Sequence, residues 1–267
     1  MKLTIWINLT ACLLLLYAPA GFAQTAKTVS LKDTKSKTMT WTTRSAEAKT
    51  LAANGVKHFR NIEMEQAYHD LSAALKLDPG FTVALVFMAN LTRGEIRKSY
   101  VARAIKSTAN KTAGEKLFAS TLDEKNTQET NRDIWAKLYS MYPDGAMIAN
   151  YYVVTRATPE ERFAAAKEYI QKFPKEPAMY NVIAYYYLQD KKDNDKAKES
   201  FEKYLSLYPD GYNPYDSMGE FYVTTGDAVN GEKYYRLALE KYPFATSSLN
   251  ALQKIVDAKP KDEAKTQ

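Results

Sequence analysis

The feature that most constrains this chain is a repeated pattern of large and small residues between Pro177 and Pro243. Each of two adjacent blocks holds four residues at spacings of three, one and three, then three residues at spacings of four and three, then a proline. The blocks are Tyr180, Ile183, Ala184, Tyr187, Ala197, Phe201, Tyr204, Pro209 and Tyr215, Met218, Gly219, Tyr222, Gly231, Tyr235, Ala238, Pro243. Such spacings place each set on one helical face, and the proline ends the second helix. The pattern predicts a helix–turn–helix unit, with Ala184 or Gly219 where the two helices approach closely.

The prolines that end the two blocks, Pro209 and Pro243, lie 34 residues apart, which is the period of the tetratricopeptide repeat. The order of large, small and large residues before a proline resembles that family over roughly residues 45–258, most clearly in the first, fifth and sixth repeats. The resemblance implies an all-α solenoid of about six helix-turn-helix repeats with a C-terminal cap helix. The stretch from Asn213 to Glu220 is also similar to repeats of exported bacterial envelope proteins.

The remaining repeats are assigned from the prolines. The first ends at Pro79, and the stretch from there to Pro143 holds two degenerate repeats that meet near Asn110. Pro159 is expected to open the second helix of the fourth repeat. After Pro243, apolar residues on one helical face predict the helix that caps the last repeat: Leu249, Leu252, Ile255 and Val256.

Residues 1–23 are typical of a secretory signal peptide. One lysine precedes an apolar run of about 15 residues, and small residues precede the expected cleavage after Ala23, with cleavage after Ala20 as the alternative. Cys12, the only cysteine, superficially resembles a lipoprotein acylation site, but the apolar run continues beyond it. The expected location is therefore the periplasm or the exterior, and no stable membrane insertion is expected after cleavage.

The segments that flank the expected solenoid are polar. Residues 24–44 are rich in Thr, Lys and Ser and are interpreted as a flexible tether, although Val29, Leu31, Met39 and Trp41 would suit a short extended arm against the first repeat. Residues 259–267 are charged and are expected to form a disordered tail. Without residues 1–23 the formal charge falls from +6 to +5, and charges of both signs alternate, which argues against nucleic acid as a partner.

The residues needed for catalysis or metal binding are not recognisable in the sequence. His58 and His69 are the only histidines, and His58 occupies a core position, so a packed core histidine is expected there. No cysteine pair, acidic calcium loop, glycine-rich phosphate loop or serine hydrolase motif accompanies them. The protein is therefore expected to be no enzyme and to require neither cofactor nor metal.

Tyrosine is concentrated in the C-terminal half, where 17 of the 20 tyrosines lie between Tyr139 and Tyr242. Core positions of the repeats account for some of them, and the others need a separate explanation. The family resemblance implies that the first helix of each repeat lines a concave groove that binds peptides. On that register the predicted partner-binding residues are Asn181, Tyr185, Asn213, Asp216, Glu220 and Asn90. The alternative site is the apolar end of the groove around Val56, Phe59, Val86 and Asn90.

Two functional hypotheses remain open. The first is a non-catalytic interaction scaffold of the periplasm or exterior that holds a peptide or a helix of a partner in its concave groove. The alternative is an accessory or regulatory subunit of an envelope enzyme or transport assembly, which contacts its partner through the convex face or the tether.

Overall fold

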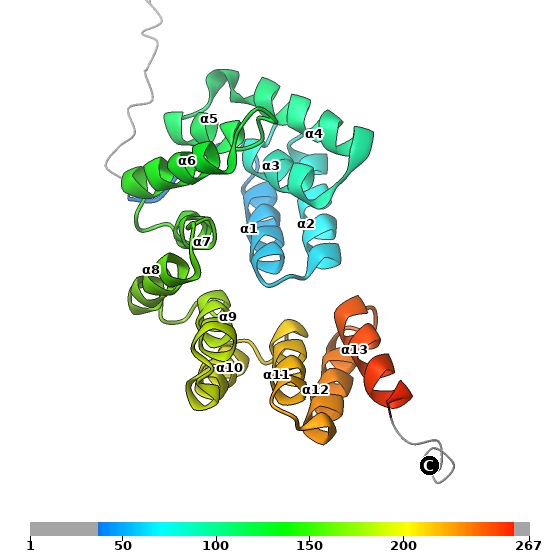
Figure 1. Cartoon of the computed structure of the whole chain (residues 1–267). Coiled ribbons are helices and arrows are strands. Elements are labelled where there is room, and N and C mark those ends of the chain that lie inside the picture. Colours follow the sequence, from blue (N-terminus) through cyan, green and yellow to red (C-terminus); the bar gives the residue numbers. More distant parts are fainter. Residues whose placement is uncertain (1–36, 259–267) are drawn as a thin grey trace, which may run out of the picture. The chain divides into compact units, whose positions relative to one another are not determined.

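The computed structural model describes residues 37–258, and these residues form helices and connecting loops with no strand among them (Figure 1). The predicted all-α fold is confirmed. The first three hairpins are α1 (Ala46–Arg60) with α2 (Met64–Leu77), α3 (Thr82–Leu91) with α4 (Gly94–Ser107), and α5 (Ala113–Ser120) with α6 (Gln128–Met141). They are followed by α7 (Ala146–Val154) with α8 (Pro159–Lys172), α9 (Ala178–Tyr185) with α10 (Asn194–Leu207), and α11 (Asn213–Thr224) with α12 (Ala228–Lys241), and then by α13 (Thr246–Asp257).

Small residues occur where the two helices of a hairpin cross. A Cβ atom added to Gly219 of α11 would lie 2.8 Å from Cδ1 of Tyr235 of α12, and one added to Gly55 would lie 2.7 Å from Cγ of Leu71. Ala184, at the same position of the fifth hairpin, is completely buried. The close approach predicted from the repeat pattern is therefore present in three hairpins.

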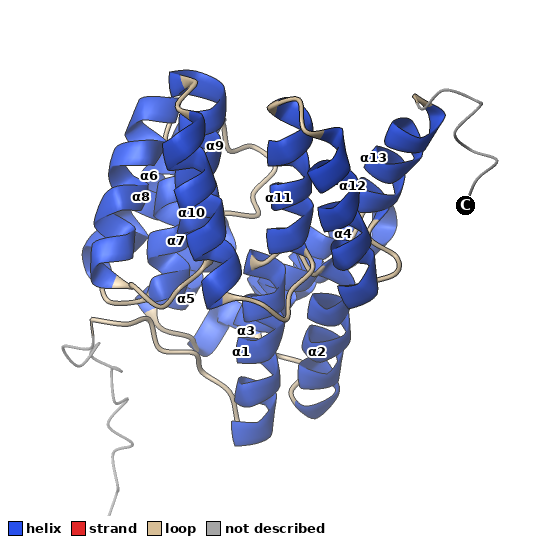
Figure 2. Cartoon of the chain, turned by 90° about the horizontal axis from the view of Figure 1, so that it is seen from below, coloured by secondary structure: helices blue, strands red, loops and turns tan. Residues whose placement is uncertain are grey.

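The helix ends follow local sequence signals. Ser45 caps α1 by accepting a hydrogen bond from the amide of Ala48, and Thr112 and Glu115 form a reciprocal capping box at α5. Pro159 lies in the first turn of α8, as predicted. Figure 2 shows the short loops that these signals leave between successive helices. Hairpins with short loops keep neighbouring helices antiparallel, which is the basis of the solenoid.

The fifth hairpin departs from regular geometry. α9 ends at Tyr185, and the chain continues as a π-helix over Tyr186–Lys191 before Lys192 adopts a left-handed conformation with φ of 54°. The left-handed residue allows the chain to reverse into α10, whose N-cap is Asp193.

The hydrophobic core follows the chain from hairpin to hairpin, and it is densest around α3. Every residue of α3 from Thr82 to Ala89 is buried, because α2, α4 and α5 pack around it. The resemblance placed Val56 and Val86 at the apolar end of an open groove, but both are buried in the core. The apolar site predicted around Val56 and Val86 is therefore wrong, since neighbouring helices cover that face.

The described part of the predicted tether, residues 37–44, is packed against the helices. Met39 is buried, and the ring of Trp41 lies 6.4 Å from that of Phe81. Glu115 accepts hydrogen bonds from the amide and the hydroxyl of Thr42, each at 2.8 Å. Residues 37–44 thus form an arm, but it reaches beyond the first repeat, against which it was predicted to lie, to Phe81 at the start of α3 and Glu115 of α5. The predicted signal peptide, the rest of the tether and the predicted tail at 259–267 lie outside the described residues.

Within the same described range, no helix combines the length and the apolar character that crossing a membrane requires.

Candidate functional site

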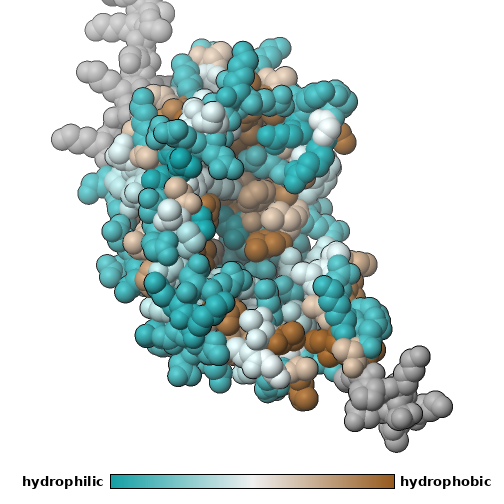
Figure 3. Space-filling view, viewed as in Figure 1, coloured by the Kyte–Doolittle hydropathy of each residue, from teal (hydrophilic) through white to brown (hydrophobic). Residues whose placement is uncertain are grey.

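A groove of about 1150 Å³ lies between α11, α12 and α13. Its apolar walls come from Val223 of α11, Val229 and Tyr235 of α12, and Ile255 of α13. Val229 is 80% exposed, so this side chain is free to contact another molecule. Figure 3 shows apolar side chains among the hydrophilic atoms at the end of the molecule formed by these helices. We call this hollow the C-terminal groove.

Two of the predicted partner-binding residues, Asp216 and Glu220, line the C-terminal groove from α11. Glu220 accepts a hydrogen bond of 2.7 Å from the hydroxyl of Tyr185, and burial together with this bond raises the pKa of Tyr185. Asp216 accepts a hydrogen bond from the hydroxyl of Ser248 on α13, while burial raises the pKa of the Asp216 carboxyl. These contacts fix both carboxylates at the edge of the groove.

The other predicted partner-binding residues do not line the C-terminal groove. Tyr185 is only half-exposed, and its ring packs edge-on against Phe201. Asn213 is buried, with its side-chain amide donating to the hydroxyl of Tyr204, so its predicted exposure to a partner is wrong. Asn181 keeps its side-chain oxygen buried without a hydrogen-bond partner, and Asn90 lies in the second hairpin at the end of α3. The structure therefore brings together Tyr185, Asp216 and Glu220 but separates Asn90 from them.

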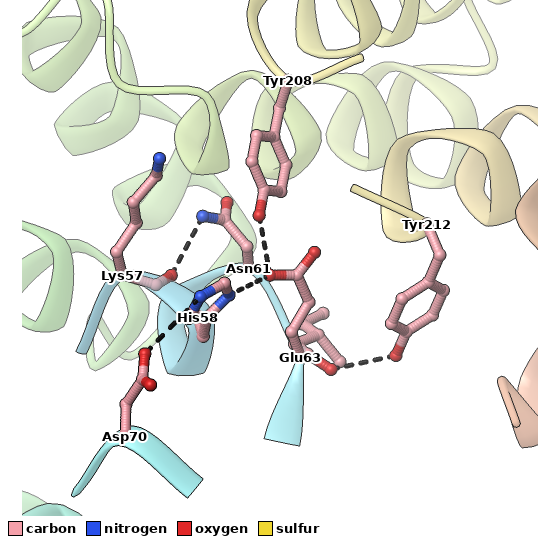
Figure 4. Close-up of polar contacts among 8 residues, drawn as sticks. Lys57, His58, Asn61, Glu63, Asp70, Tyr208 and Tyr212 are labelled. Atoms are coloured by element: carbon pink, nitrogen blue, oxygen red, sulfur yellow. Dashed lines mark hydrogen bonds and ion pairs between the residues drawn. The ribbon is translucent and has the colours of Figure 1, made fainter. Parts of the chain in front are cut away.

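A second polar site joins the turn between α1 and α2 to the later hairpins (Figure 4). The hydroxyl of Tyr208 donates to the carboxylate of Glu63 at 2.6 Å, and the hydroxyl of Tyr212 donates to the backbone carbonyl of Ile62 at 2.9 Å. The hydroxyl of Tyr242 also donates to the carboxylate of Glu65. We call Tyr208, Tyr212 and Tyr242 the tyrosine row.

The same turn makes an ionic contact with the fourth hairpin. Arg60, at the end of α1, lies 2.6 Å from the carboxylate of Glu176 and donates to the hydroxyl of Tyr169 at 2.6 Å. The side chain of Arg60 is 9% exposed and that of Glu176 is 38% exposed, so only the arginine is shielded from water. The first hairpin is thereby bound to hairpins four, five and six.

His58 is not the packed core histidine that the sequence predicted. Its side chain is 30% exposed, and Nδ1 lies 2.5 Å from the carboxylate of Glu63. Its Nε2 lies 3.7 Å from Asp70. The contacts of His58 orient Glu63 toward Tyr208, because one oxygen of Glu63 serves both partners.

The tyrosine row explains part of the tyrosine excess noted in the sequence. Tyr208 and Tyr242 each precede the proline that ends a repeat, and both hydroxyls bind carboxylates of the first hairpin. Sequence reasoning missed this site because its two halves are more than 140 residues apart. The Tyr-Pro pair that recurs at the ends of the repeats was the sequence feature that could have indicated this site.

No group of three or more His, Cys, Asp or Glu side chains able to hold a metal ion occurs in the described part of the chain.

The family model for the tetratricopeptide repeat matches residues 177–210. A search of the curated proteins found no match to this chain. Solved structures similar to it include the Cut9–Hcn1 hetero-tetramer of the APC/C, at 15% identity and a TM-score of 0.49, covering 79% of this chain and 43% of that chain. The chain therefore spans less than half the length of the Cut9–Hcn1 chain that it matches.

Two further similar structures have names connected with pili. PilW, described as a widely conserved type IV pilus biogenesis factor, is 15% identical with a TM-score of 0.47, covering 79% of this chain and 99% of that chain. The pilF protein of Pseudomonas aeruginosa is 13% identical with a TM-score of 0.44, covering 80% and 98% of the two chains.

The matched segment coincides with the fifth hairpin, and the same close crossing of paired helices recurs in the first and sixth hairpins. The chain accordingly contains a tetratricopeptide repeat at residues 177–210, within a series of helical hairpins that extends over the described residues.

Proposed function

We propose that this protein is a non-catalytic interaction scaffold whose C-terminal groove binds an amphipathic helix of a protein partner. The observation that carries this proposal is the groove itself, with a volume of about 1150 Å³ and apolar walls. Solenoids of this kind bury their apolar faces between neighbouring helices, so an uncovered groove at a terminal hairpin is suited to a further helix.

The length of the groove favours a helix as its occupant. Its lining residues run from Ala228 to Glu240 along α12 and from Ser247 to Ala258 along α13. At 1.5 Å per residue, thirteen positions of α12 correspond to roughly 18 Å, or between three and four helical turns. Charged side chains of both signs line the groove, so they suit a partner helix that has both acidic and basic residues beside its apolar face: Asp216, Glu220, Glu232, Glu240, Lys233, Arg236 and Lys254.

Val229→Asp tests the proposed binding surface, because Val229 is highly exposed and a charge there opposes apolar docking. Ile96→Asp on α4 is the matched control, since Ile96 is 61% exposed and does not line the groove. Chemical cross-linking in cells followed by mass spectrometry should show one partner that is lost from Val229→Asp and kept by Ile96→Asp. Equal recovery of every cross-linked protein from both variants would refute the proposal.

We further propose export to the periplasm or exterior, on the strength of the signal-peptide pattern of residues 1–23. Protein produced from the full sequence and recovered from the periplasm should begin near Gln24. An N-terminus at Met1, or acylation at Cys12, would contradict this location.

A further inference from the structure

The tyrosine row joins parts of the chain that are far apart in sequence, through hydrogen bonds of its three hydroxyls to two carboxylates and one backbone carbonyl. Tyr208 and Tyr242 lie 145 and 177 positions from their carboxylate partners. The contact buries Tyr212 and Glu63, but the apolar side chains of the same turn, Ile62 and Met64, remain 45% and 43% exposed. The apolar side chains of the turn therefore contribute little to the contact.

The hydroxyls of the tyrosine row act as donors. Burial and the hydrogen bond to Glu63 raise the pKa of Tyr208, and the hydrogen bond to Glu65 raises the pKa of Tyr242. Burial raises the pKa of Tyr212 to about 12. All three phenols therefore keep their protons at neutral pH and can donate them to carboxylates or carbonyls.

The turn that occupies the row has a strained backbone. Ile62 has a φ of 66°, a left-handed conformation that is unfavourable for a β-branched residue. This conformation belongs to the C-terminal cap of α1, where the amide of Glu63 donates to the carbonyl of His58. The turn is held on the tyrosine row mainly by hydrogen bonds, for which the carboxylates of another segment can substitute.

We propose that the tyrosine row is a binding site for an acidic peptide segment of a protein partner, and that the turn between α1 and α2 occupies this site as an intramolecular competitor. The occupant defines the ligand class: Glu63 and Glu65 are two residues apart, with the carbonyl of Ile62 beside them. A partner with two glutamates in a Glu-x-Glu arrangement presents the same acceptors. This site is separate from the C-terminal groove and does not depend on the function proposed for that groove.

The probe for this site is a fluorescent synthetic peptide with the sequence of residues 59–67, which contains both glutamates. Full-length Glu63→Ala/Glu65→Ala protein lacks the competing carboxylates and should bind the peptide about tenfold more tightly than the unchanged protein, since hydrogen bonds to charged acceptors are the stronger class. Fluorescence anisotropy measures the binding, and circular dichroism verifies that the variant is folded. Glu124→Ala/Glu129→Ala, which removes two exposed glutamates elsewhere, should bind like the unchanged protein.

Two further measurements assign the binding to the row. Adding Tyr208→Phe and Tyr242→Phe to the Glu63→Ala/Glu65→Ala protein should abolish the gain in affinity for the peptide, because phenylalanine keeps the aromatic ring but lacks the hydroxyl that donates the hydrogen bond. A peptide with both glutamates replaced by glutamine should bind at least severalfold more weakly. Equal affinity for the unchanged and variant proteins, or a gain that survives removal of the hydroxyls, would overturn the proposal.

Discussion

At the residue scale, Gly219 shows how the repeat pattern limits side-chain volume. Gly219→Leu places new atoms where the ring of Tyr235 lies 2.8 Å from the glycine's Cβ position, so unfolding should require about 1–3 kcal/mol less free energy. Urea denaturation measures this loss. Gly80→Leu is the control, because the nearest atom to that Cβ position is 3.7 Å away. A similar loss in both variants would contradict the assigned crossing of α11 and α12.

Asp216 gives a second prediction at this scale, through the pH dependence of stability. Burial raises its pKa above the ordinary value of 3.8, so the folded protein binds this proton more tightly than the unfolded chain. The stabilising contribution is complete below that ordinary value and is lost as the pH rises through the folded pKa. Asp216→Asn should therefore gain stability relative to the unchanged protein between about pH 4 and pH 7. Urea titrations across this range measure the free energy of unfolding of both proteins. If the two free energies changed with pH in parallel, the result would argue against a raised pKa of Asp216.

At the scale of elements, Glu115 connects the arm of residues 37–44 to α5. Its carboxylate accepts from the amide and hydroxyl of Thr42 and from Thr112, while the side chain is completely buried. Glu115→Gln replaces one acceptor oxygen with a donor and should destabilise the fold by about 1–3 kcal/mol. Hydrogen exchange at the Thr42 amide should accelerate, whereas Glu124→Gln on the surface should leave it unchanged. Unaltered exchange would mean that apolar packing of Met39 and Trp41 is sufficient to hold the arm.

The sequence predicted elements well wherever local signals decide them. Spacing, prolines and caps were enough to identify the hairpin of α11 and α12 and the start of α8. The burial of Val56 and Val86 could not be predicted in the same way, because it depends on how neighbouring helices surround α3. The burial of Asn213 could not be predicted for a similar reason, because its hydrogen-bond partner, the hydroxyl of Tyr204, belongs to the preceding hairpin.

At the scale of the whole molecule, the contact of the α1–α2 turn with the tyrosine row changes how stability is distributed. An open solenoid is approximately a sum of nearest-neighbour terms and frays from its ends. Here the first hairpin also supports the fifth and sixth, through Tyr208, Tyr212 and Tyr242. This long-range support has no counterpart in the repeat pattern, so the position of Glu63 beside Tyr208 could not be predicted from the sequence.

Glu63→Ala/Glu65→Ala should therefore weaken two distant regions together. Hydrogen exchange should show local protection lowered by about 1–3 kcal/mol in both α1–α2 and α10–α12, because the buried carboxylate of Glu63 and the exposed one of Glu65 are lost at one end and phenol hydrogen bonds at the other. Protection in α5 and α6, which do not contribute to the row, should be unchanged. Loss confined to α1 and α2 would show that the contact does not stabilise the later hairpins.

The packing of Trp135 against Tyr151, with ring centroids 4.5 Å apart, gives the two halves of the molecule different optical signals. The three tryptophans are Trp6, Trp41 and Trp135, so indole emission from the described residues reports on the first three hairpins. Beyond Tyr151 the aromatic absorbance comes from tyrosine and phenylalanine alone. Tryptophan fluorescence can therefore follow the N-terminal hairpins, while tyrosine difference absorbance is weighted toward the C-terminal ones, since most tyrosines lie from Tyr151 onward. A lag between the two signals in one unlabelled sample would show that the two sets of hairpins unfold at different times.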